Sequence, residues 1–185
     1  MSAEKREPAR ISQGYVPGAL GRVVSLHAAY YQRHWGFGLH FESLVASEMA
    51  AFLRRVEDGA TAGDPASADS ALWLAWLPGV RGEEEIAGAI TVDGAERDAA
   101  GARIRWFILD EARQGAGIGK ALMAAAMDFC RVRGFPRVYL TTFAGLDAAR
   151  ALYEAHGFAL TDTHRDTTWG VPVEEQRFEW TPQPK

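Results

Sequence analysis

The segment that most restricts the fold is "ILDEARQGAGIGKALM", residues 108–123, in which three glycines fall within five residues. Apolar residues before it, over 102–110, have the pattern of a strand, and those after it predict a helix to about Arg133. A second strand pattern follows at 137–143. Strand, helix and strand in this order predict a right-handed crossover between two parallel strands. An α/β unit with the glycines at its first turn is therefore expected.

The remaining segments extend this unit into one mixed α/β domain. Apolar residues at helical spacing predict helices from Leu20 to Tyr31 and from about His40 to Val56. Residues 58–70 are small and polar and are expected to form an exposed loop. A shorter helix is expected over 147–156, ending at a glycine. Further strand patterns occur at 10–16, 71–77, 86–92, 158–164 and 175–180.

Length and composition fit a single domain in the cytoplasm. The chain has 185 residues, 48% of them hydrophobic, and its single cysteine excludes an intrachain disulfide. A net charge of −4 argues against a broad nucleic-acid surface, and no apolar run approaches the roughly 20 residues that cross a bilayer. We predict a flexible tail at 1–9 and one domain over 10–181. Assembly into a homodimer is left open.

Spacing excludes two common phosphate-binding loops. A dinucleotide fingerprint starting at the first glycine would place its last glycine at Lys120, and a P-loop would require a glycine at Gln114 and a hydroxyl at Ala121. What remains is the pattern Gln114-x-x-Gly117-x-Gly119 at a junction between a strand and a helix.

This pattern can still bind an anion. The first N–H groups of a helix are unpaired and lie at the positive end of the helix dipole. Glycines allow a diphosphate to approach these groups, and Lys120 adds a positive charge. A glycine-rich turn without a ligand is the alternative that this short pattern leaves open.

Two motifs resemble those of the GCN5-related N-acetyltransferase (GNAT) family. "RQGAGIGKAL", residues 113–122, is similar to the family's pyrophosphate loop, Q/R-x-x-G-x-G/A. "AARALYEAHGF", residues 148–158, resembles its A-x-x-LYE-x-x-GF element. The resemblance covers about 70–180. It implies a mixed sheet flanked by helices, with antiparallel N-terminal strands and a parallel pair around the crossover helix.

The resemblance also implies a donor and a reaction. Members of the family bind acetyl-CoA and transfer its acetyl group directly to a primary amine of a small molecule or a protein, without a metal. The strand before the loop is bulged and pairs with the pantetheine arm, a role that falls here on Phe107, Ile108 and Leu109. The diphosphate role falls on Gln114, Gly115, Ala116, Gly117, Ile118, Gly119 and Lys120.

Tyr153 matches the tyrosine that in many relatives protonates the departing CoA thiolate, a leaving group that needs a proton donor. An amphipathic packing role is the alternative. Two positions depart from the family pattern. Leu146 stands where many relatives have an asparagine that contacts the cofactor, and the strand at 137–143 offers Thr141 and Thr142 instead of a carboxylate base. The general base is therefore unassigned: a carboxylate elsewhere can act through water, or the amine can arrive neutral.

Three other residues have competing interpretations. Glu48 interrupts an apolar helix stripe, so it either faces the acceptor cleft or lies at the stripe's edge and reaches water. His164, expected in a loop after a strand, is either a base or a solvated histidine. Cys130 shares the apolar face of the crossover helix and is expected to be a core residue. No histidine has metal-ligand spacing, so no metal site is expected.

A non-catalytic module that binds or senses acyl-CoA is the competing function. The absence of the asparagine and of an assigned base favours it, whereas the retained Tyr153 favours an enzyme. The acceptor and the length of the acyl chain are not readable from the residues.

Overall fold

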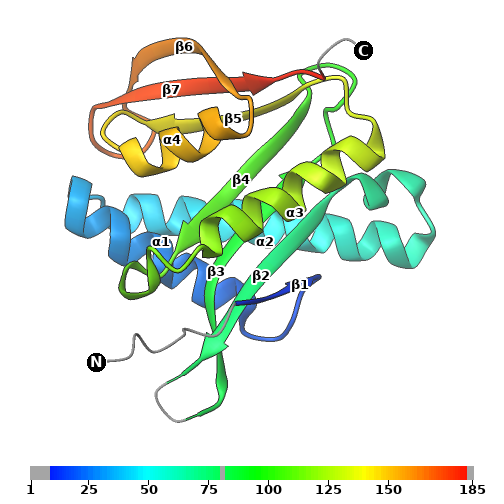
Figure 1. Cartoon of the computed structure of the whole chain (residues 1–185), viewed down its shortest axis with the longest axis horizontal. Helices are drawn as coiled ribbons and strands as arrows, with labels where there is room; N and C mark the ends of the chain where they lie inside the picture. The colour runs from blue at the N-terminus through cyan, green and yellow to red at the C-terminus, as the bar shows by residue number, and fades with distance from the viewer. Residues whose placement is uncertain (1–8, 80–81, 183–185) are drawn as a thin grey trace, which may run out of the picture.

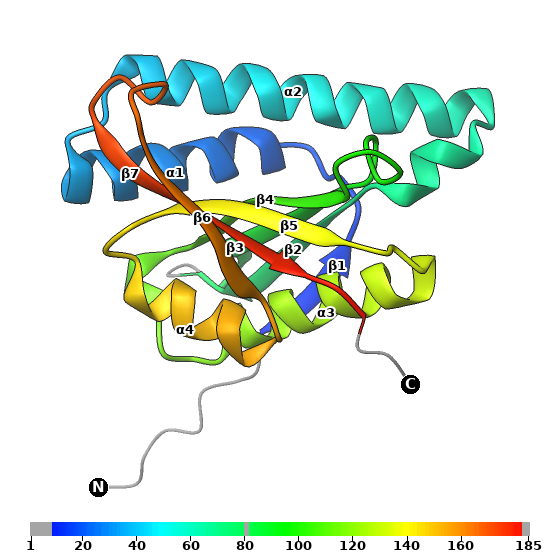
Figure 2. The same ribbon diagram turned by 90° about the horizontal axis from the view of Figure 1, so that it is seen from above.

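Within the described residues, 9–79 and 82–182, a seven-stranded sheet separates two layers of helices (Figure 1). The strands are β1 (Arg10–Gln13), β2 (Ala71–Pro78), β3 (Glu84–Asp93), β4 (Ala102–Leu109), β5 (Val138–Phe143), β6 (Ala159–Asp166) and β7 (Val173–Trp180). The helices are α1 (Ala19–Trp35), α2 (Leu39–Ala62), α3 (Ile118–Arg133) and α4 (Asp147–Ala155). This computed structural model places the strands in the order β1-β2-β3-β4-β5-β7-β6. Figure 2 shows α1 and α2 on one face of the sheet and α3 and α4 on the other.

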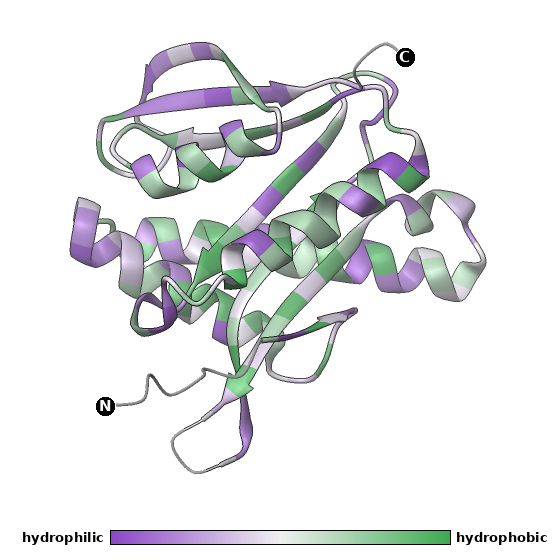
Figure 3. Cartoon of the chain, in the orientation of Figure 1, coloured by the Kyte–Doolittle hydropathy of each residue, from purple (hydrophilic) through white to green (hydrophobic). Residues whose placement is uncertain are grey.

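Each face of the sheet has its own hydrophobic core. Leu122, Met123 and Met127 of α3 are fully buried against one face. Figure 3 shows much of the α3 ribbon in the pale green of apolar residues. Phe41 and Phe52 of α2 are buried against the other. Burying a side chain of this size contributes about 1.5–3 kcal/mol, so the helices are held mainly by these stripes. The expected mixed α/β architecture is confirmed.

A β-bulge in β4 exchanges the two faces of that strand. Ala89 and Thr91 of β3 pair with Ile108 and Arg105, so Trp106 and Phe107 together occupy the space opposite a single residue of β3. Trp106 has a φ of 45°, which is strained for a bulky L-residue. Before the bulge, apolar side chains face α3; after it, Trp106 and Ile108 face α1 and α2.

The bulged strand also parts from its parallel neighbour. β4 and β5 pair only at Ala102↔Val138 and Arg103↔Tyr139. Beyond these residues β5 continues in register with β7, and the two parallel strands diverge in a V (Figure 1). The edge of β4 after Arg103 is therefore not covered by β5, and the sheet is open at this point.

The element boundaries differ from expectation mainly in one place. Residues 58–70 were expected to be a loop, but α2 continues to Ala62 and a 3₁₀ turn follows at Pro65–Asp69. A Cβ on Gly59 would lie 2.8 Å from the Ser67 Cβ, so this small residue lets the turn pack against the helix. β1 ends at Gln13, earlier than expected, and His164 lies inside β6 instead of in a loop.

The predicted flexible tail lies outside the described residues, except for Ala9, which packs against the core on the α3 side. None of the helices among the described residues is long and apolar enough to cross a membrane.

Candidate active site

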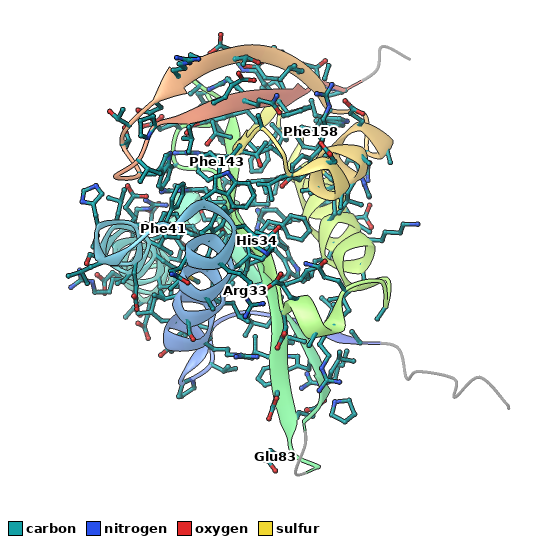
Figure 4. All side chains as sticks on the ribbon, turned by 90° about the vertical axis from the view of Figure 1, so that its left-hand side faces the viewer. Arg33, His34, Phe41, Glu83, Phe143 and Phe158 are labelled. Atoms are coloured by element: carbon teal, nitrogen blue, oxygen red, sulfur yellow. The ribbon has the colours of Figure 1, made fainter. Side chains whose placement is uncertain are left out.

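A cavity of about 100 Å³ lies where β4 and β5 diverge. We call it the splay cavity. Some of its wall belongs to the core on the α3 and α4 side, namely Ile104, Phe107, Leu140 and Tyr153. Other wall residues belong to the α1 and α2 side, namely Tyr31, Phe41, Val45, Trp106, Phe143 and Trp169. The cavity therefore crosses the sheet. Figure 4 views this end of the molecule, with Phe41 and Phe143 labelled on one side and Phe158 on the other.

Tyr153 lies on the α4 side of the cavity and is 6% exposed. Its ring packs near Phe107, Phe158 and Phe178, at centroid distances of 6.2, 6.4 and 5.9 Å. Burial raises the pKa of its phenol, and a hydrogen bond with Thr142 acts in the opposite direction. The phenol therefore keeps its proton at neutral pH. Tyr153 is both a packing residue and a cavity residue, so packing alone does not describe it.

The glycine loop exposes backbone at the start of α3. Gly115 and Gly117 have φ values of 80° and 78°, which favour glycine, and a Cβ on either would meet no described atom within 4 Å. Gly117 is the N-cap of α3, and no side chain of the described chain caps this end. The first N–H groups of α3 are therefore left for a ligand or solvent.

Gly119 has a different role from the two exposed glycines. It is buried, and a Cβ there would lie 3.2 Å from Leu109 Cδ1 and 3.5 Å from both Leu152 Cδ2 and Phe107 Cζ. The missing side chain thus allows α3 to lie close to β4 and α4. Phe107, which lines the cavity, lies next to this position, so the start of α3 is close to the splay cavity.

The other residues of the expected cofactor site surround this helix start. Gln114 and Lys120 are exposed, Ala116 packs against the core, and Ile118 is buried in it. On β4, Leu109 faces α3 while Ile108 faces the opposite core, as alternation requires. Their backbone role toward a ligand stays a prediction.

The α1 and α2 side of the cavity has a polar wall of Glu48, Arg103 and Arg105. Arg105 forms an ion pair with Glu48 and lies 3.9 Å from Asp93. The Glu48 side chain is 39% exposed, so it both lines the cavity and reaches water. Burial and the neighbouring Arg103 lower the pKa of Arg105. Since Glu48 is held by Arg105, it is poorly placed to act as a free base.

His27 of α1 adds a neutral imidazole to the wall. It is 5% exposed, and its Nδ1 lies 2.9 Å from the Val23 carbonyl oxygen. A carbonyl only accepts, so the proton lies on Nδ1 and Nε2 is left as an acceptor. Burial lowers the His27 pKa to about 4, so the ring is neutral at physiological pH.

Cys130 is a core residue, as expected. It lies on the buried face of α3 and is fully buried, and this burial raises the pKa of its thiol to about 12. A thiol of this kind is a poor nucleophile. Leu146, at the position of the family asparagine, is the N-cap residue of α4 and makes no side-chain cap.

His164 does not line the splay cavity. It lies on β6 with Asp166 of the same strand and Glu175 of the neighbouring strand β7, and their potential ligand atoms are within 4.8 Å of one another. Both carboxylates already accept hydrogen bonds, Asp166 from the Thr168 backbone and Glu175 from the Trp169 indole. The group is therefore better explained as a hydrogen-bonded turn than as a metal site.

Arg103, Arg105 and His27 were not predicted from the sequence as cavity residues. A signal for the arginines was present in "ARIRWF", residues 102–107, where charges occupy alternate positions of an apolar strand. Alternation places both on one face, and a buried face with two charges indicates a polar site. His27 carried no such signal, because its position on the apolar stripe of α1 is typical of a core histidine.

A family comparison agrees with this geometry. A model of the Acetyltransferase (GNAT) family matches residues 41–158, which is more than half of the chain. The chain belongs to this family. The matched region includes β4, the glycine loop, α3, β5 and α4, and therefore most of the splay cavity.

Two curated proteins named as acetyltransferases are similar in sequence. The chain is 34% identical to a mycothiol acetyltransferase of Beutenbergia cavernae over 118 residues, 64% of this chain and 36% of that protein. It is 38% identical to the uncharacterized N-acetyltransferase YjgM of Escherichia coli over 100 residues, 54% of this chain and 59% of that protein. The alignments thus span about a third of one relative and three fifths of the other.

The fold is also found in solved GNAT structures. The structure of yncA from Salmonella typhimurium, solved with its cofactor acetyl-CoA, is 12% identical and has a TM-score of 0.64 over 92% of this chain and 93% of that one. At this identity the likeness concerns the fold, and the GNAT fold expected from the two motifs is confirmed.

Proposed function

We propose that this chain is an N-acetyltransferase that moves the acetyl group of acetyl-CoA to a primary amine. The observation that carries the proposal is the splay cavity, which crosses the sheet between β4 and β5. On one side it is lined by Phe107, whose ring lies next to Gly119 near the start of α3, and on the other side it carries the polar wall. A donor and an acceptor that enter from opposite faces can meet there, which favours direct transfer in a ternary complex.

The donor site that we infer is made mainly of backbone. The pantetheine arm would pair with the open edge of β4 at Phe107, Ile108 and Leu109, in the place that β5 leaves. The diphosphate would bind the N–H groups from Gly115 to Lys120, at the positive end of α3. The cytoplasmic location expected from the sequence stays a prediction.

The reaction that fits this arrangement has one proton donor. A neutral amine attacks the thioester carbonyl carbon, backbone N–H groups stabilise the developing oxyanion, and the C–S bond breaks. The leaving thiolate takes the proton of the Tyr153 phenol, and the nitrogen, which becomes positively charged on attack, releases one proton that restores the phenol through water. Tyr153 is placed for this role because its phenol is protonated at neutral pH and lines the cavity.

No strong base lines the cavity among the described residues. Glu48 is paired with Arg105, and His27 has a pKa of about 4. We therefore infer that the amine loses its proton to water before it attacks, while His27 Nε2 can accept a hydrogen bond from the neutral amine. The rate at subsaturating amine should then rise with pH up to the pKa of the amine.

The test is acetyl-CoA binding by calorimetry together with CoA release in the presence of a panel of amines. Binding with amine-dependent release supports the enzyme. Tight binding without release for any amine would favour the alternative, a non-catalytic acyl-CoA sensor. Replacing acetyl-CoA with longer acyl-CoA donors in the same assay would define the acyl preference.

A further inference from the structure

The polar wall of the splay cavity contains a cation that the transfer reaction does not use. Arg103 and Arg105 are two residues apart on β4 before the bulge, so their side chains lie on the same face of the strand. Both line the cavity on the α1 and α2 side. Arg105 is engaged by Glu48 and lies near Asp93, whereas the ion pairs of the described residues do not include Arg103.

Arg103 is incompletely satisfied. Its Nη2 donates to Thr141 Oγ1 at 3.0 Å. Its Nε is buried and has no hydrogen-bond partner among the described residues. Unpaired buried polar groups are rare and costly in native proteins, and each one asks for an explanation such as a ligand. A guanidinium that lines a cavity, has an unpaired donor and forms no ion pair among the described residues is a suitable site for a planar anion.

The charges around Arg103 also favour an anion. Two arginines line the cavity with only one carboxylate, Glu48, among the described residues, and His27 is neutral. A polyamine would bring further positive charge next to two guanidinium groups. An acceptor with a carboxylate would instead supply the missing acceptor for Arg103 and offset the excess charge.

We propose that Arg103, with Arg105 beside it, binds a carboxylate of the acceptor, which is therefore a small primary amine that carries a carboxylate, such as an amino acid. This inference rests on the acetyl transfer proposed above and specifies its acceptor. The small size of the cavity, about 100 Å³, fits a carboxylate and a short side chain. The carboxylate at Arg103 would hold the molecule so that its amine reaches the part of the cavity next to Tyr153.

The test uses pairs of amines that differ only in the carboxylate: β-alanine with ethylamine, and L-leucine with isoamylamine. CoA release gives kcat and KM for each. The carboxylated member should have a kcat/KM about 10- to 100-fold higher, the range of one hydrogen-bonded charge interaction. In Arg103→Gln this preference should collapse through a higher KM, with kcat little changed, and Arg103→Lys should restore part of it.

Arg177→Gln is the matched control. Arg177 lies over the same Tyr139 ring as Arg103, at 3.9 Å against 5.8 Å, but it belongs to β7 and does not line the cavity. Its loss should leave the carboxylate preference intact. A loss of preference equal to that of Arg103→Gln would mean that disturbed packing at Tyr139, not anion binding, explains the result.

Acetyl-CoA affinity is measured in parallel, so the two proposals fail separately. Equal efficiency for both members of each pair, with acetyl-CoA binding intact, overturns the carboxylate site and leaves the acetyltransferase. Failure to bind acetyl-CoA overturns the proposed function. Calorimetry of β-alanine and ethylamine with the protein alone then still tests the site, since only β-alanine should bind and Arg103→Gln should abolish binding. A stronger preference for O-phosphoethanolamine than for β-alanine would replace the carboxylate with a phosphate.

Discussion

The two sides of the splay cavity are built in different ways. On the α3 side, the proposed donor site comes from one continuous stretch, from Phe107 to Lys120, and acts through backbone N–H and C=O groups. On the α1 and α2 side, side chains from distant segments meet, as when Arg105 of β4 pairs with Glu48 of α2. A local backbone site depends on glycine spacing, whereas a side-chain site depends on how the whole chain folds. The donor site should therefore tolerate side-chain substitutions that do not block its backbone groups. The acceptor side should be altered by a substitution that removes or adds a single charge.

The largest effect is expected from Gly117→Asp, which should abolish the backbone site. The substitution strains a residue with a φ of 78° and places a carboxylate where the diphosphate would bind. Loss of two charge-assisted hydrogen bonds should weaken acetyl-CoA binding about a thousandfold in calorimetry.

Gly134→Asp is the control for Gly117→Asp, because Gly134 has a φ of 68° and open space around it but lies at the other end of α3. It should bind acetyl-CoA normally. Equal affinity in the two variants would contradict the loop assignment. Gly119 gives a less clean test, since a side chain there would push against Leu109 and destabilise the fold.

The next effect is on the acceptor side and concerns pH. The folded-state pKa of His27 is about 4, against 6.5 in the unfolded chain, so between these values only the unfolded chain takes up the proton. Protonation of His27 in the unfolded chain therefore lowers the free energy of unfolding as the pH falls from 6.5 to 4. Above pH 6.5 the ring is neutral in both states and this loss is absent. The full loss amounts to about 3 kcal/mol.

Urea unfolding at pH 7.0 and pH 4.5 should show most of this loss in the wild type. His27→Leu should show a smaller difference between the two pH values, and His40→Gln, at an exposed position, should behave like the wild type. Identical pH dependence in the wild type and His27→Leu would mean that the imidazole is hydrated in the cavity.

A smaller effect is expected where the two sides meet, at Tyr153. Tyr153→Phe keeps the ring that packs against Phe178 but removes the proton donor. Since the proton is transferred only as the C–S bond breaks, kcat should fall about 100-fold, at the low end for general acids, and acetyl-CoA affinity should be unchanged. A kcat within about twofold of the wild type would restrict Tyr153 to packing and require another acid.

The smallest effect is expected at Cys130, on the buried face of α3. Cys130→Ala should lower the free energy of unfolding by about 1–2 kcal/mol, because it truncates a fully buried side chain. Transfer kinetics should not change, because its thiol has a pKa of about 12 and does not line the cavity. Loss of turnover in a stable variant would indicate a covalent acyl-cysteine mechanism.

The difference between a local backbone site and a side-chain site from distant segments also explains what could be predicted from the sequence. The order of strands and helices follows from hydrophobic period, and the loop before α3 follows from glycine spacing, so both were predicted. The helical end of α2 was not, because its small polar residues are also typical of loops, and packing of the 3₁₀ turn against Gly59 decides between them. The polar wall was recognised only at Glu48, since Arg103 and Arg105 mark a polar site only if α2 packs over their face of β4, which the strand pattern alone does not show.

That bulge gives β4 two opposite parities. Before the bulge, the odd-numbered residues, such as Arg103 and Arg105, face the acceptor side, which is the α1 and α2 side of the sheet. From Trp106 onward, the even-numbered residues, such as Trp106 and Ile108, face that side instead. Substitutions at 103 and 105 can thus alter what the wall recognises without touching the residues that run alongside the donor. Deleting Trp106 would restore regular alternation, so that Phe107, Ile108 and Leu109 keep their faces and β4 loses only its bend and the Trp106 side chain of the acceptor-side core.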